Sequence, residues 1–73
     1  MAGIRDVVVD FIKLRWPGSH ESSWGGFVEI RVSGNYFVFF FEDAGIRSGR
    51  SRVVFNYDDP LFFEKLVGYL KDV

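Results

Sequence analysis

The first apolar residues of the chain recur at helical spacing, and charged residues fill most of the positions between them. The apolar stripe consists of Ile4, Val7, Val8, Phe11 and Ile12. A proline disfavours helix for the residue before it and a glycine interrupts helices, so this helix should end before Trp16-Pro17-Gly18. The polar residues Ser19 to Ser23 that follow read as a loop.

From Phe27 the pattern changes to an alternation of apolar and polar residues, which predicts a strand. Gly34-Asn35 is a hairpin signal, and the aromatic run from Tyr36 predicts a second strand. A two-residue loop at Gly34-Asn35 would pair Val32 with Phe37, Ile30 with Phe39, and Val28 with Phe41. All six side chains then share one apolar face, so the register is physically coherent.

The glycine-rich stretch from Asp43 to Arg50 is expected to be a loop, and a third strand should run from Arg52 to Tyr57. In that strand Val53, Phe55 and Tyr57 should join the core, and the register should pair Glu42 with Arg52 and Phe40 with Val54.

The last element begins with an acidic cap. Asp59 can accept a hydrogen bond as the N-cap, and Pro60 suits the first helical position, where its missing N–H has no consequence. The apolar stripe of this helix consists of Phe62, Phe63, Leu66, Val67 and Leu70.

The sequence therefore predicts one α+β domain over residues 1–73, with the order αβββα. A three-stranded antiparallel sheet should carry both helices on one face. Its other face, here called the open face, would carry a mixture of apolar and charged side chains: Phe27, Glu29, Arg31, Tyr36, Val38 and Phe40.

The composition favours a partner for that face. Apolar residues make up 48% of the chain and aromatic residues 19%, which is more than so small a core readily absorbs. The absence of cysteine excludes a disulfide scaffold and a thiolate site, and it favours a cytoplasmic protein. The N-terminus predicts neither a signal peptide nor a membrane span. The lack of Gln and Thr leans towards a thermophilic source.

Single-stranded nucleic acid is one partner that fits. Aromatic side chains on a sheet stack with bases, and arginines at the edge hold phosphates. No acidic residue occurs between Ala44 and Tyr57, which leaves a local basic patch in a chain of net charge −1. Glu29 on the same face opposes a surface dedicated to phosphate. The candidate binding residues are Phe27, Arg31, Tyr36, Phe40, Arg47, Arg50 and Arg52.

A second copy of the chain is the alternative partner. A homodimer formed through the open face would hide its apolar side chains and enlarge a small core. Trp16 and Trp24 bracket the polar loop, where they either cap the core or contact a partner, and the core is the favoured place.

Catalysis is not expected. The run His20-Glu21-Ser22-Ser23 contains the residue types of a catalytic triad, but neighbouring residues do not normally converge on one reacting atom. One histidine without cysteine does not build a zinc site, and no phosphate-binding Gly-Lys-Ser motif occurs. We therefore predict no catalytic residue, metal, cofactor or small-molecule substrate.

The predicted order αβββα is that of the double-stranded RNA-binding domain, which places lysines at the start of its last helix. Asp58-Asp59-Pro60 stands there in this chain and would repel phosphates. In composition, plan and aromatic sheet the chain more closely resembles the ThermoDBP-type single-stranded DNA-binding proteins of hyperthermophilic archaea. That resemblance implies an apolar cleft edged by basic side chains in an archaeal protein; no motif is shared, so it assigns no residue a role. A small protein of an archaeal virus would fit equally well.

Overall fold

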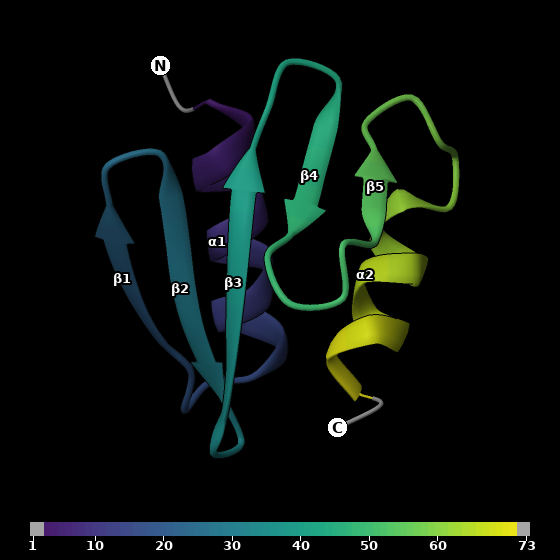
Figure 1. Cartoon of the computed structure of the whole chain (residues 1–73). Helices are drawn as coiled ribbons and strands as arrows, with labels where there is room; N and C mark the ends of the chain where they lie inside the picture. The colour runs from purple at the N-terminus through teal and green to yellow at the C-terminus, as the bar shows by residue number, and fades with distance from the viewer. Residues whose placement is uncertain (1–2, 72–73) are drawn as a thin grey trace.

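The computed structural model describes residues 3–71, in which two helices flank five strands (Figure 1). The elements are α1 (Ile4–Arg15), β1 (His20–Trp24), β2 (Phe27–Val32), β3 (Asn35–Phe41), β4 (Gly45–Ser48), β5 (Val54–Asn56) and α2 (Phe62–Lys71). The strands form one antiparallel sheet in chain order. The α+β class agrees with the sequence, but the expectation of three strands was wrong.

Both helices lie behind the sheet in Figure 1, and the core fills the space between the two layers. From α1, Val8 and Ile12 are buried against the strands. From α2, the ring of Tyr69 lies 5.6 Å from that of Phe37 and 5.5 Å from that of Phe55, measured between centroids. Because both helices use this face, neither helix covers the open face.

The strand β1 replaces the loop that the polar run Ser19 to Ser23 predicted. It pairs with β2 along its whole length, from His20 opposite Arg31 to Trp24 opposite Phe27. An edge strand has only one strand neighbour and covers little of the core, so its side chains need not alternate between apolar and polar. The polar composition of this segment therefore gave no sign of a strand.

The strand β4 replaces part of the loop predicted from Asp43 to Arg50. Its Ile46 is fully buried, and its small residues Gly45 and Ser48 are buried as well. A Cβ at Gly45 would lie 2.3 Å from the carbonyl oxygen of Phe55, so only glycine fits against β5. The sequence pattern predicted a loop because glycine is typical of flexible segments. In β4 the glycine is instead required by close packing against the neighbouring strand.

The β2–β3 hairpin turns one residue earlier than predicted. Ser33 and Gly34 occupy the turn with φ of 51° and 84°, and positive φ at both central residues belongs to a type I′ turn. The pairs are consequently Ile30 with Phe37 and Val28 with Phe39. This shift of two residues preserves every side chain's face, so the predicted core survives the wrong register.

The strand β5 is shorter than the predicted third strand, and Val53 is exposed instead of joining the core. The predicted pairs of Glu42 with Arg52 and Phe40 with Val54 were wrong, because β4 intervenes between β3 and β5. Arg47 of β4 pairs with both Phe40 and Val54.

The helix α2 begins two residues beyond the predicted first helical position, Pro60. Asp59 therefore lies three residues before the helix instead of at its N-cap, and its Oδ1 accepts a hydrogen bond of 2.9 Å from the amide of Leu61 in the turn that leads into the helix. A hydrogen bond from the side chain of Lys65, supported by the one from the Leu61 amide, holds the pKa of the Asp59 carboxyl below its usual range.

Truncation of Phe39 tests this packing. Phe39 is 1% exposed on the helix-facing side of β3, so Phe39→Ala should lower the free energy of unfolding by about 3–5 kcal/mol. Urea denaturation followed by circular dichroism measures this change. Leu14→Ala is the control, because Leu14 is 83% exposed on α1 and should cost little. Equal stability of the two variants would contradict the assignment of Phe39 to the core.

Candidate nucleic-acid interface

One row of side chains crosses all five strands on the open face. The register places Trp24 opposite Phe27, Phe27 opposite Phe40, Phe40 opposite Arg47, and Arg47 opposite Val54. The row therefore consists of three aromatic residues followed by an arginine and a valine. The sequence predicted that Phe27 and Phe40 share this face, whereas the two missed strands supply Trp24 and the placement of Arg47.

Contacts along the row occupy part of this surface. The rings of Phe27 and Phe40 are 5.8 Å apart and inclined at 49°. The guanidinium carbon of Arg47 lies 4.6 Å from the centroid of Phe40, which is a cation–π geometry. The Nε of Arg47 also lies 3.6 Å from Oε1 of Glu42. Arg47 thus has two partners within the chain, which reduces what it can offer a phosphate.

A second pair lies nearer the β2–β3 turn. Tyr36 is 52% exposed, and the guanidinium carbon of Arg31 on the neighbouring strand lies 6.0 Å from its ring centroid. Glu29 shares the open face two residues from Arg31, so one carboxylate stands between the two rows. Tyr36 is more accessible to a stacking partner than Phe27 or Phe40, which are half-buried.

A hollow of about 280 Å³ opens between these rows. It is lined by Tyr36, Val38, Phe40, Gly49 and Arg50. The amide of Gly49 donates a 2.7 Å hydrogen bond to the carbonyl of Val38, which places the backbone of Gly49 beside β3. A Cβ at Gly49 would lie 3.1 Å from side-chain carbons of both Phe40 and Val38. Glycine therefore permits this close approach and leaves the hollow open.

Buried Ser48 organises the loop that follows β4 and carries two arginines. Its amide donates to the carbonyl of Val53 at 2.9 Å, and its Oγ accepts from the amide of Val53 at 3.0 Å. These bonds close the loop, in which Arg50 and Arg52 are exposed. Within residues 3–71 no carboxylate lies at ion-pair distance from either guanidinium.

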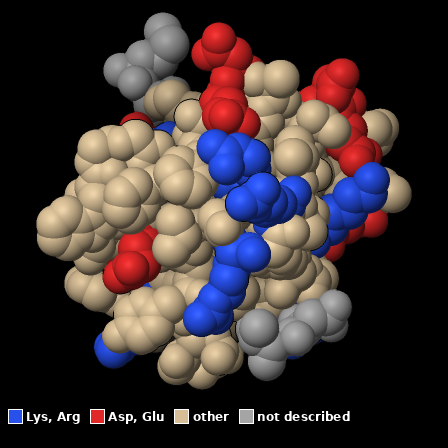
Figure 2. Space-filling view, viewed as in Figure 1, with Lys and Arg blue, Asp and Glu red and all other residues tan. Residues whose placement is uncertain are grey.

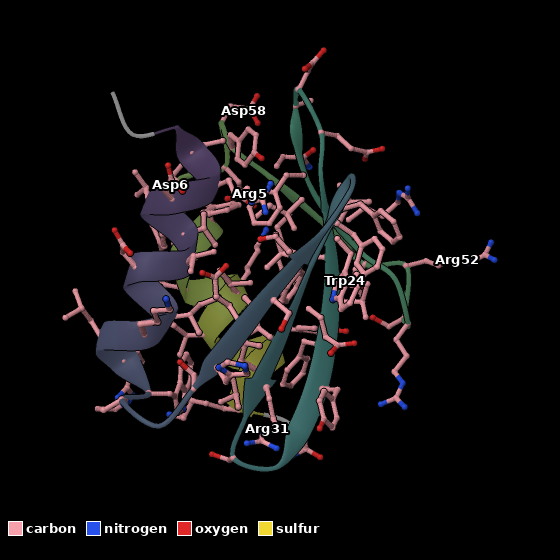
Figure 3. The ribbon with its side chains drawn as sticks, turned by 90° about the vertical axis from the view of Figure 1, so that its left-hand side faces the viewer. Arg5, Asp6, Trp24, Arg31, Arg52 and Asp58 are labelled. Atoms are coloured by element: carbon pink, nitrogen blue, oxygen red, sulfur yellow. The ribbon has the colours of Figure 1, made fainter. Side chains whose placement is uncertain are left out.

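Charged side chains are distributed unevenly over this side of the molecule. Figure 2 shows a band of Lys and Arg side chains down the middle of the open face, with Asp and Glu above it, on the right and in a separate patch to its left. Figure 3, turned by 90°, shows Arg52 pointing away from the sheet on the side opposite α1. Arg52 also has a φ of 58°, a left-handed conformation that glycine adopts at lower cost.

The upper margin is acidic and lies where β3 turns into β4. A hollow there is lined by Asp43, Ala44, Asn56, Tyr57 and Asp58. Burial raises the pKa of the Tyr57 hydroxyl, and the nearby carboxylates of Asp43 and Glu42 raise it further. Phosphates are repelled from this end of the sheet, so the arginines at its middle and opposite end define the basic region.

The structure thus brings the predicted residues into three groups on one side of the molecule. Phe27, Phe40 and Arg47 share the first row, Arg31 and Tyr36 form the second, and Arg50 and Arg52 project from the loop. Trp24 belongs with them: it is 59% exposed, so its favoured placement in the core was wrong. Its place opposite Phe27 follows from β1, which the polar pattern concealed.

No protein-family model, curated protein or solved structure matches this chain. Neither helix in residues 3–71 combines the length and apolar character that crossing a membrane requires. The same residues contain no group of three or more His, Cys, Asp or Glu side chains suited to a metal ion. Functional interpretation consequently rests on the geometry of the open face.

The two central aromatic residues of this face should differ in their structural importance. Phe40 contacts Phe27 and Arg47, so Phe40→Ala should lower the free energy of unfolding by roughly half the 3–5 kcal/mol of a fully buried phenylalanine. Tyr36→Ala should cost less than about 1 kcal/mol, as exposed substitutions do. Urea denaturation of both variants checks this order, and the reverse order would contradict the geometry described.

Proposed function

We propose that this chain binds single-stranded nucleic acid on the open face of its sheet, inside the cell. The observation that carries the proposal is the hollow lined by Tyr36 and Phe40 with Arg50 at its rim. An aromatic floor and an adjacent guanidinium, which has no ion-pair partner in residues 3–71, match the two parts of a nucleotide. The base would stack on a ring and the phosphate would meet the arginine.

The exposed rings can supply much of the affinity. Base–aromatic stacking contributes about 1–3 kcal/mol per base by alanine substitution. Tyr36 and Trp24 expose more than half of their surface, so each can accept a base without rearrangement of the core. Phe27 and Phe40 are half-buried and would serve as the apolar floor between them.

The electrostatic contribution must be local, because the net charge is −1. Arg31, Arg50 and Arg52 lie on this face without an ion-pair partner among the described residues. Each phosphate of a single strand that is neutralised contributes about −0.7 to the slope of the logarithm of the affinity against the logarithm of the salt concentration. If each of the three arginines neutralises one phosphate, the slope should be about −2.

The arginines of the loop give the sharpest test. Arg50→Ala and Arg52→Ala should each weaken binding to every sequence alike and reduce the salt slope by about 0.7. Arg47→Ala should reduce it by less, because Glu42 already pairs with Arg47. Fluorescence anisotropy of a labelled single-stranded oligonucleotide, measured at several salt concentrations, gives both quantities.

Lys71→Ala is the matched control, since it removes one positive charge from exposed Lys71 at the end of α2. It should leave the slope unchanged. If the wild-type chain does not bind, or if binding survives in the double arginine variant with an unchanged slope, the proposal is wrong.

Self-association is a second candidate function, and the specific observation that favours it lies on the helices. Along α1, Ile4, Val7, Phe11 and Leu14 repeat at steps of three and four residues, which is the spacing of a coiled-coil seam. Phe11 meets Phe63 of α2 at a centroid distance of 4.7 Å. An apolar hollow of about 380 Å³ lies beside this pair. A homodimer would bury this seam and leave the open face accessible.

Two charge substitutions separate the possible dimer surfaces. Leu14→Glu should shift a helix-mediated dimer to monomer, because it places a carboxylate in the seam. Val54→Glu, at an exposed apolar position of the open face, should leave that dimer intact. Sedimentation equilibrium measures both. Dissociation by Val54→Glu alone would instead assign the interface to the sheet, and a monomeric wild-type chain would exclude self-association.

A further inference from the structure

A second hollow, of about 510 Å³, lies at the end of the sheet opposite the acidic margin. The segment after α1 forms one wall with Arg15, Trp16 and Ser19, and the β2–β3 hairpin forms the other with Arg31 and Ser33. Figure 3 shows Arg31 at this lower end, next to the hairpin turn. None of the residues that line the hollow is acidic.

Two arginines line this hollow, and an aromatic ring lies near the guanidinium group of each. The guanidinium carbon of Arg15 lies 5.6 Å from the ring centroid of Trp16, and that of Arg31 lies 6.0 Å from the centroid of Tyr36. Neither arginine forms an ion pair within residues 3–71. Two arginines that line one cavity, without a counter-ion among the described residues, favour the binding of an anion.

The hydroxyl of Ser19 is a second, independent indication. Its Oγ is buried and has no hydrogen-bond partner among the described residues. Buried polar atoms are rarely left unpaired in proteins. A serine hydroxyl can donate to an anionic oxygen, and Ser19 is one of the residues that line the hollow.

The C-terminus of α1 opposes an anion, but weakly. A helix end carries roughly half a negative charge, against two full positive charges from the arginines. Two carbonyls at this end are also engaged: that of Ile12 accepts from the amide of Trp16 at 2.8 Å, and that of Trp16 accepts from the amide of Ser19 at 2.9 Å. The balance at the hollow is therefore positive.

We infer that this hollow is a phosphate-binding site, with Arg15 and Arg31 as the charged ligands and the Ser19 hydroxyl as a neutral donor. Guanidinium groups suit phosphate because their forked N–H groups match its oxygens. The phosphate would be either a free ion or the terminal phosphate of a single strand. The second source rests on the proposed function, since Arg31 and Tyr36 join this hollow to the open face.

The test uses the full chain and inorganic phosphate, followed by NMR at constant ionic strength. Saturable shifts should be confined to the amides from Trp16 to Ser19 and to the hairpin turn. Arg15→Gln should weaken binding at least about tenfold, the loss expected for one charge-assisted hydrogen bond. Ser19→Ala should also weaken it without loss of thermal stability, because it removes an unpaired buried hydroxyl.

The controls are Lys71→Gln for charge and Ser23→Ala for a serine of β1 that does not line the hollow. Both should bind phosphate as the wild type does. Absent or unsaturable shifts in the wild type, or unchanged affinity in Arg15→Gln, would overturn the assignment.

Oligonucleotides with and without a terminal phosphate then distinguish the two sources. Tighter binding of the phosphorylated form, abolished by Arg15→Gln, assigns the site to a strand end, while equal binding of both forms assigns it to free phosphate. Phosphate binding without oligonucleotide binding would refute the proposed function alone. Oligonucleotide binding without phosphate shifts at the hollow would refute this inference alone.

Discussion

The ring of Tyr69 is the contact on which the rest of the structure depends. It packs edge-on against Phe37, Phe39 and Phe55, and so fixes α2 over strands from both sides of β4. Its hydroxyl also accepts a 3.1 Å hydrogen bond from Ser51, in the loop after β4. One side chain therefore ties the apolar core to the loop that carries the exposed arginines. Because such edge-to-face pairs each contribute about 0.5–1.5 kcal/mol beyond burial, the position of that loop is coupled to the stability of the core.

Strand geometry transmits this constraint to the open face. Successive side chains of a strand point to opposite faces, so burying Phe37 and Phe39 forces Tyr36, Val38 and Phe40 outward. The aromatic content of the open face is thus linked by alternation to the content of the core. Alternation does not determine how much of each ring on the open face is covered by neighbouring side chains. In this chain Arg47 covers part of Phe40, whereas the hollow beside Gly49 leaves the ring accessible from the other side.

Face assignments could be predicted from the sequence because they depend only on the parity of residue numbers. The wrong hairpin register was displaced by two residues, so Phe39 and Phe40 kept their faces. The number of strands could not be predicted in the same way. β1 is an edge strand whose first four residues are polar, and β4 contains a glycine that close packing requires. Both depend on neighbours that a local pattern does not contain. Because β1 and β4 were missed, Trp24 was wrongly placed in the core and the ion pair of Arg47 with Glu42 was not predicted.

The charge distribution decides how an anion would approach. Carboxylates surround the β3–β4 turn, and guanidinium groups surround the β2–β3 turn at the other end of β3. The molecule extends 29 × 25 × 23 Å, so the two ends are separated by more than the Debye length of about 8 Å at physiological salt. Each end therefore acts locally, and the net charge of −1 does not prevent an anion from binding at the arginines. If the chain binds a single strand as proposed, the fields overlap at low ionic strength and the acidic end directs that strand towards Arg31 rather than across the whole sheet.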